Sequence, residues 1–162
     1  MSNLTIRSVL GLVFWVLFCP MAMAHVFSGR VVHVSDGDTI VVLQDNRHST
    51  KIRLAAIDCP EKSQPFGRQA QRFTQAFCDG QRVTVTTTKK DRYGRTIGTV
   101  QVGSKRLDIA LLEAGLAWHY RYFDHDPALD ALEQQARAER KGLWSEANPT
   151  PPWDYRKARR RR

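Results

Sequence analysis

Five short segments in the first two thirds of the chain alternate between apolar and polar residues and are rich in β-branched side chains. Turn-forming Asp, Gly and Asn residues separate them, a pattern that is typical of β-strands. The expected strands cover residues 27–34, 39–45, 51–57, 82–88 and 96–102. The first three follow one another closely, so we expect them to form a meander.

Three further segments have the features of helices, and they cover residues 68–77, 106–115 and 124–142. Ala70, Phe73 and Phe77 fall on one face of the first segment. The third segment opens with Asp126 as an N-cap and Pro127 at the first helical position. One helix after the third strand and two after the fifth predict an α+β fold, a five-stranded OB-type barrel with three helices.

The chain is strongly basic for its size. It has 162 residues, with 25 Lys and Arg against 16 Asp and Glu, and a formal net charge of +9. This length suits a single domain. The pI near 9.9 favours an acidic partner, such as nucleic acid or an anionic membrane surface. Residues 149–162 are rich in proline and arginine, and we expect a basic tail there without a helix.

The first residues are typical of a targeting segment. A positively charged start precedes an apolar run, and the letters AMA before His25 form a cleavage site. The alternative is a membrane anchor, but the run is short for a span of ~20 residues and Pro20 interrupts its end. We therefore expect export to a periplasm or secretion, with a signal peptide over residues 1–24, a domain over 25–148 and the tail over 149–162.

Two cysteines, Cys59 and Cys78, stay in the expected mature chain. An oxidising compartment permits a disulfide between them, and the alternative is two small buried thiols. Their separation along the chain says nothing about their distance in space, so the sequence leaves both alternatives open.

Two acid-bearing turns end neighbouring strand segments. Asp38 stands in SDGDT after the first strand, and Asp58 stands in IDCPE after the third. In a meander these two carboxylates lie close together, and burial increases the cost of their repulsion. A hard divalent cation such as calcium removes this conflict, because it binds carboxylate and carbonyl oxygens. Pro60 stiffens the turn that carries a further acid, Glu61.

Two arginines belong to the same predicted site. Arg53 lies on the third strand, and Arg95 ends the turn DRYGR between the fourth and fifth strands. Guanidinium groups match phosphate oxygens with paired hydrogen bonds and stabilise developing negative charge. Each motif alone is weak, because Asp-Gly-Asp is usually only a turn. Together, a metal ion, two arginines and a spare carboxylate are what phosphodiester hydrolysis requires.

The chain resembles the staphylococcal nuclease-like, or thermonuclease, family in six segments that follow family order. They read SDGDTI, IRLAAIDCPE, FGRQAQRFT, DRYGR, LLEAGLAW and GLWSEANP, and they run from about Val26 to Pro149. The resemblance implies an OB-type barrel with three helices. It also implies a calcium-dependent enzyme that cleaves DNA and RNA with little sequence preference and leaves 3′-phosphate ends.

The resemblance also implies a role for each matching residue. The implied metal ligands are Asp38, Asp58 and the backbone carbonyl of Cys59. Asp36 is implied to be a nearby acid that does not contact the metal directly. The implied catalytic residues are Glu61 as general base and Arg53 and Arg95 as phosphate clamps. The implied substrate contacts are Arg92, Tyr93, Tyr120 and Tyr122.

Two departures from the best-known member and two rival functions bear on this hypothesis. Cys59 replaces a threonine, and the loop KSQPFG is shorter. One rival is an OB-fold module that binds nucleic acid without cutting it, and the other is a basic structural protein of the cell envelope. A module that only binds is expected to have lost metal acids or arginines, and a structural protein does not explain them. We therefore expect a monomeric enzyme with DNA and RNA as substrates.

Overall fold

The computed structural model describes residues 24–161, with the side chain of Thr88 left out. The predicted signal peptide, apart from Ala24, lies outside the described residues. Within this range no helix combines the length and the apolar character that crossing a membrane requires.

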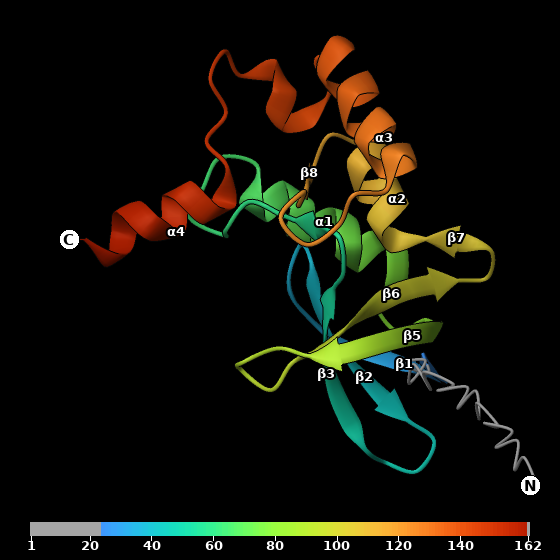
Figure 1. The fold of residues 1–162 in the computed structure, drawn as a ribbon. Coiled ribbons are helices and arrows are strands. Elements are labelled where there is room, and N and C mark those ends of the chain that lie inside the picture. The colour runs from blue at the N-terminus through green and yellow to red at the C-terminus, as the bar shows by residue number, and fades with distance from the viewer. Residues whose placement is uncertain (1–23, 162) are drawn as a thin grey trace, which may run out of the picture.

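Five strands close into a barrel in the order β3-β2-β1-β5-β6 (Figure 1). They are β1 (His25–Asp36), β2 (Thr39–Gln44), β3 (Ser49–Leu54), β5 (Arg82–Lys90) and β6 (Thr96–Val102). The first three form the predicted meander, with antiparallel pairing throughout. β3 then pairs in parallel with β6 and completes the circle. The predicted five-stranded barrel is therefore confirmed, and β7 (Lys105–Arg106) only extends its edge.

The third predicted strand is interrupted near its end. β3 stops at Leu54, and Ala56 has a φ of 63°, which lies in the left-handed region. The chain then forms β4 (Ile57–Asp58), which pairs with β8 (Trp118–His119) in a separate two-stranded ladder. Asp58 is therefore held by this ladder rather than by the barrel sheet.

The three predicted helices are present. They are α1 (Gly67–Cys78), α2 (Leu107–Glu113) and α3 (Pro127–Ala138). The N-cap of α3 is Asp126, whose Oδ1 accepts a hydrogen bond from the Ala128 amide at 2.9 Å. A single 3-10 turn, η1 (Gly142–Ser145), follows α3.

The expectation of a tail without a helix was wrong, because α4 (Pro152–Arg160) adds a fourth helix (Figure 1). Proline is favourable at the first helical position, where no backbone donor is needed. Asp154 stands in the first turn, and Lys157, Arg159 and Arg160 stand in the last, where the charges complement the helix dipole. The composition that argued against a helix therefore suits one, because the prolines lie at its start and the cations at its end.

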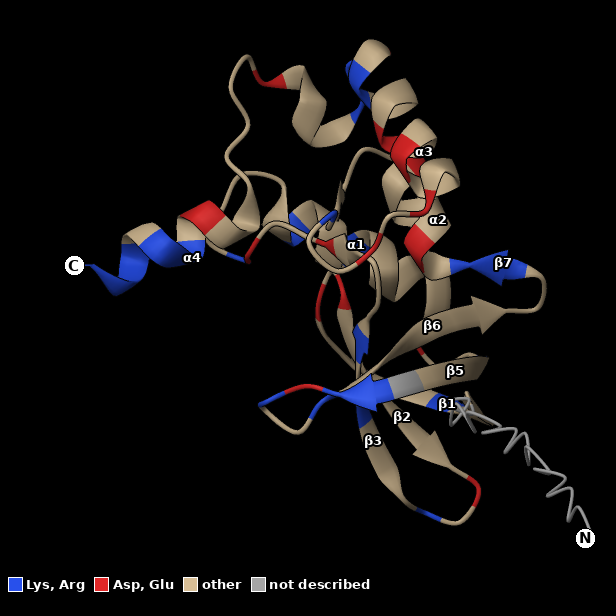
Figure 2. Ribbon diagram, in the orientation of Figure 1, with Lys and Arg blue, Asp and Glu red and all other residues tan. Residues whose placement is uncertain are grey.

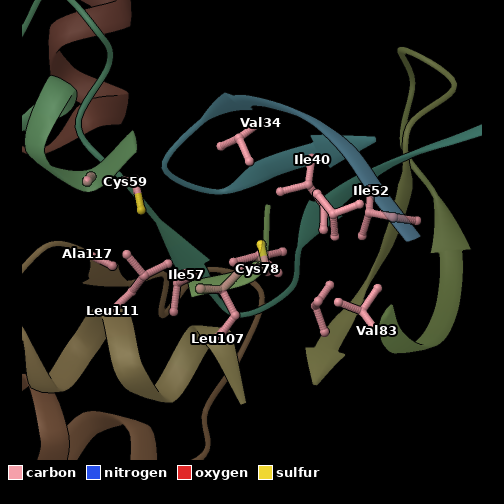
Figure 3. Close-up of a cluster of buried hydrophobic side chains, with 14 of the residues drawn as sticks. Val34, Ile40, Ile52, Ile57, Cys59, Cys78, Val83, Leu107, Leu111 and Ala117 are labelled. Atoms are coloured by element: carbon pink, nitrogen blue, oxygen red, sulfur yellow. The ribbon is translucent and has the colours of Figure 1, made fainter. Parts of the chain in front are cut away.

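The main core lies between the barrel and the helices. Figure 3 shows Ile40, Ile52 and Val83 from the strands, with Leu107 and Leu111 from α2 nearby, and these side chains are at most 1% exposed. Cys59 and Cys78 belong to this core and are both free thiols. A smaller cluster, Trp118, Ala136, Leu143 and Trp144, packs beside it.

Candidate active site

Asp38 is fixed where the tight turn after β1 enters β2. Its Oδ1 accepts from the Thr39 hydroxyl at 3.1 Å, and its Oδ2 accepts from the Cys59 amide at 2.9 Å. The preceding Gly37 leaves no room for a side chain, because a Cβ there would lie 2.8 Å from the Cβ of Cys59 and 2.7 Å from that of Ala70. The sequence SDGDT therefore packs its turn against the second acid-bearing turn.

Arg53 joins the two central carboxylates. Its Nη2 donates to Asp58 Oδ1 at 2.7 Å, and its Nη1 forms an ion pair with Asp38 Oδ2. All three side chains are buried, and Asp58 is only 1% exposed. The meander thus brings Asp38 and Asp58 to one guanidinium.

The acids of this group are electrostatically unequal. Burial, together with the charge of Asp38, raises the pKa of Asp36 to about 7. For Asp38, burial acts in the opposite direction to Arg53, and the guanidinium and hydrogen bonds outweigh it and lower the pKa. For Asp58, burial is the largest influence and raises the pKa, although Arg156 and Arg53 oppose it.

A second arginine reaches the group from α4. Arg156 Nη2 donates to Asp58 Oδ2 at 2.7 Å, and its Nη1 donates to Glu61 Oε1 at 2.8 Å. Nη1 also lies 3.2 Å from Asp58 Oδ1. Each Asp58 oxygen therefore has a guanidinium donor from the C-terminal helix.

Glu61 stands in the turn after Pro60, and its side chain is about one third exposed. Its amide donates to Gln64 Oε1 at 2.8 Å, and Gln64 Nε2 donates to the Thr150 carbonyl at 3.1 Å. The buried Gln64 side chain thus fixes this turn and ties it to the segment just before α4.

The β5–β6 turn carries Arg92, Tyr93 and Arg95. Asp91 organises it, since its Oδ2 accepts from Arg95 Nε at 2.7 Å and its Oδ1 from the amides of Tyr93 and Arg95 at 2.9 Å. Tyr93 is 65% exposed. Among the described residues, no hydrogen bond or ion pair joins this turn to the carboxylates of Asp38, Asp58 or Glu61. The predicted clamp Arg95 is therefore held by its own turn, and the predicted substrate residues Arg92 and Tyr93 are exposed beside it.

Tyr120 and Tyr122 belong to an aromatic group after β8. Their ring centroids are 6.4 Å apart, and Phe123 lies edge-on to both. Trp153 of α4 stacks on Tyr120, with centroids 5.1 Å apart and planes inclined by 8°. Tyr122 is 79% exposed, whereas one face of Tyr120 is covered.

Sequence reasoning missed Arg156 and Trp153, because it treated their segment as a tail. A signal was present in the letters PPWDYRKARR, where prolines precede an acid and then a basic run. That order is typical of a helix with favourable ends. The contacts with Asp58 and Tyr120, however, join residues that are distant in sequence, and local patterns do not predict them.

The donor types in the buried group suit a hard cation. Asp38 and Asp58 offer carboxylate oxygens, and among the described barrel residues their ion-pair partner is Arg53. Within residues 24–161, no cluster of three or more His, Cys, Asp or Glu side chains has the arrangement of a metal site. A cation at this place would therefore be held by the two carboxylates and the neighbouring backbone. In this structure the carboxylates pair with arginines.

Comparisons with known proteins identify the family to which the chain is similar. Residues 51–146 match the family described as staphylococcal nuclease homologue. An uncharacterized endonuclease of Escherichia coli is 41% identical over 151 residues, which cover 93% of this chain and 97% of that protein. The micrococcal nuclease of Shigella flexneri is 40% identical over 143 residues, covering 82% of each chain. A staphylococcal-like nuclease of Arabidopsis thaliana is 38% identical over 110 residues, 68% of this chain and 34% of that protein.

Proposed function

We propose a calcium-dependent activity on DNA and RNA for this chain, which belongs to the staphylococcal nuclease family. The family supports a nuclease with nucleic acid as substrate. The proposal adds that calcium is the cofactor, that sequence preference is low, and that the products carry 3′-phosphate ends.

The residues proposed to hold calcium are Asp38, Asp58 and the backbone carbonyl of Cys59. The first two are buried carboxylates joined by one arginine, and the third follows directly in the chain. When bound, the cation would neutralise negative charge on the phosphate and its transition state. A cysteine suits the third position, because a backbone carbonyl does not depend on the side chain.

Glu61 is proposed to take the proton from the attacking water. The water oxygen then forms a bond to phosphorus, the bond from phosphorus to the 5′-oxygen breaks, and the leaving oxygen gains a proton from solvent. The phosphate stays on the 3′ side. A positioned general base contributes ~10²–10⁴-fold to such a step, and the partial exposure of Glu61 gives water access to it.

Arg53 and Arg95 are proposed to bind the phosphate. Arg53 lies at the carboxylates already, and Arg95 stands on an exposed turn held by Asp91. Paired guanidinium hydrogen bonds suit both the phosphate and its transition state. Arg92 and Tyr93 on the same turn, and Tyr120 and Tyr122 beyond β8, are proposed to contact the rest of the substrate.

The observation that carries this proposal is the buried pair Asp38 and Asp58 beside Glu61. Two buried acids at one place cost stability even with Arg53 and Arg156 as partners, and a purely structural domain does not require them. The rival hypothesis, an OB-fold module that only binds nucleic acid, needs the basic surface but has no use for these acids.

The test is incubation of plasmid DNA and of RNA with the mature chain and calcium, with and without a chelator. We expect cleavage of both substrates that stops on chelation, and products whose 3′ ends become extendable only after phosphatase treatment. Binding without cleavage would support the rival module. Full cleavage in excess chelator would contradict the calcium assignment.

We also propose that the protein is exported and acts as a monomer in the periplasm or outside the cell. The support for export is the leader-like segment of residues 1–24. Edman sequencing of protein from the cell exterior or periplasm, with His25 expected first, tests the cleavage site. Static light scattering tests the monomer.

A further inference from the structure

Helix α4 occupies the carboxylates to which the proposed function assigns the cation. Arg156 donates to both oxygens of Asp58 and to Glu61 Oε1, at 2.7 to 3.2 Å. Its guanidinium therefore uses the same Asp58 oxygens that would coordinate a bound cation. One carboxylate oxygen cannot give its best geometry to a bidentate guanidinium and to calcium together.

The same helix also covers the aromatic surface proposed for substrate. Trp153 lies parallel to Tyr120 with ring centroids 5.1 Å apart. It also contacts Trp118 edge-on at 5.6 Å. A nucleic acid base can stack on that face of Tyr120 only after Trp153 leaves it. One helix thus blocks two parts of the site at the same time.

Few further contacts hold the helix in place. The Tyr155 hydroxyl lies 2.9 Å from Ser63 Oγ, and Arg159 Nη1 lies 3.3 Å from the same oxygen. Pro152 is its one buried residue among those described. The apolar surface that the helix buries comes mainly from Pro152 and from Trp153, which packs on the smaller cluster. Local opening is easiest where few apolar contacts are lost, and opening of α4 loses little beyond these two.

We propose that α4 is an autoinhibitory latch that calcium and nucleic acid displace, an inference that rests on the proposed function. Arg156 competes with the cation, and Trp153 competes with the base. The basic end of α4, shown in blue in Figure 2, contributes to release because a polyanion attracts its exposed arginines. The latch makes the site open fully only when cation and substrate are both present.

The latch predicts a measurable loss of calcium affinity in the intact chain. Apparent affinity falls in proportion to the open fraction of the protein. A latch that is closed about nine tenths of the time therefore weakens calcium binding about 10-fold. Removing the Arg156 side chain should therefore restore the calcium affinity that the closed latch lowers.

The test compares the mature chain with Arg156→Ala, with Trp153→Ala and with the matched control Lys157→Ala, using calorimetric titration with calcium. Lys157→Ala removes the same charge from the same helix, and no hydrogen bond or ion pair of Lys157 is lost among the described contacts. We expect Arg156→Ala to bind calcium about 10-fold more tightly, Trp153→Ala about 3-fold more tightly, and the control to match the original chain. Two variants at different contacts keep the test valid if one of them folds poorly, which thermal melts reveal.

Hydrogen exchange provides a second readout that does not involve cleavage. Amides of residues 153–160 in the original chain should exchange faster after calcium is added, while those of α3 stay unchanged. Equal calcium affinities in all four proteins, or unchanged exchange in α4, would overturn the latch even if DNA cleavage is intact. Loss of cleavage in every protein, with tighter calcium binding in Arg156→Ala, would support the latch and overturn the proposed nuclease.

Discussion

Two groups of buried acids and arginines differ in how their charges are balanced. On α3, Glu133 is fully buried and accepts from the His119 amide at 2.5 Å, from Arg137 Nε at 2.9 Å and from Arg121 Nη1 at 3.2 Å. At the barrel end, the acids Asp36, Asp38, Asp58 and Glu61 have two arginine partners within residues 24–161, Arg53 and Arg156.

The difference separates a structural group from a functional one. Arg137 is one helical turn from Glu133, and Arg121 lies two residues after β8, so both donors come from segments inside the fold. At the barrel end, one of the two donors belongs to a terminal helix. Acids that outnumber their arginine partners, one of which can leave with α4, lower the stability of the fold. Folding alone does not require such an arrangement. It is useful where a divalent cation has to bind.

The largest expected effect is the loss of catalysis when Asp38 or Asp58 of the barrel-end acids is removed. Asp38→Ala or Asp58→Ala should reduce calcium-supported DNA cleavage to background, because each removes a charged ligand from the proposed cation site. The matched control is Asp45→Ala, which removes an exposed acid paired with Arg82. Full cleavage by either site variant would show that the barrel group is structural, like the group on α3.

Glu61→Gln should slow turnover by ~10²–10⁴-fold, because it keeps the shape of the side chain and removes the proposed base. Single-turnover cleavage with saturating enzyme measures this change, and equilibrium binding of substrate should change little. Turnover equal to that of the original chain would assign Glu61 to structure.

The structural group should respond in stability instead. Glu133→Ala leaves the buried His119 amide and Arg137 without their acceptor, whereas Arg121 keeps Asp130. A buried donor without a partner costs about 1–3 kcal/mol. Urea unfolding followed by circular dichroism measures the loss. Glu139→Ala, at the C-cap of the same helix, is the control, and little change is expected because Glu139 pairs at the surface with Lys141. A stable Glu133→Ala protein would remove the distinction between the two groups.

A chain that ends at Ala158 should separate the terminal arginines from the latch. It loses four arginines but keeps Trp153 and Arg156. Binding to long DNA with calcium withheld should then depend less steeply on log salt, by up to ~0.9 per lost phosphate contact. Calcium affinity should rise much less than in Arg156→Ala, because the truncation removes the Arg159 contact with Ser63 but leaves Arg156 on Asp58. Coinciding salt slopes for the two chains would show that these arginines do not contact DNA.

The smallest expected effect is at the free thiols. Burial raises the pKa of Cys78 to about 12, so almost no thiolate exists at pH 8. A disulfide reagent should therefore react slowly with the folded mature chain, and with two thiols after denaturation. Absence of thiols after denaturation would indicate a disulfide and contradict the structure.

The sequence predicted the barrel and three helices because their signals are local. Alternation defines the strands, and Asp126 with Pro127 defines the start of α3. The meander also placed Asp38 near Asp58, since register follows from strand order. The contact of Arg156 with Asp58 joins residues 98 positions apart. It also depends on a helix that the proline and arginine content of residues 149–162 argued against.

Calorimetric titration of the mature chain with calcium tests most directly whether the barrel-end acids hold the cation. We expect one site in the original chain, one site in Asp45→Ala, and no measurable site in the double variant Asp38→Ala, Asp58→Ala. Circular dichroism should confirm that all three proteins are folded. Calcium binding of unchanged affinity in the folded double variant would contradict the account, because the cation would then be held elsewhere.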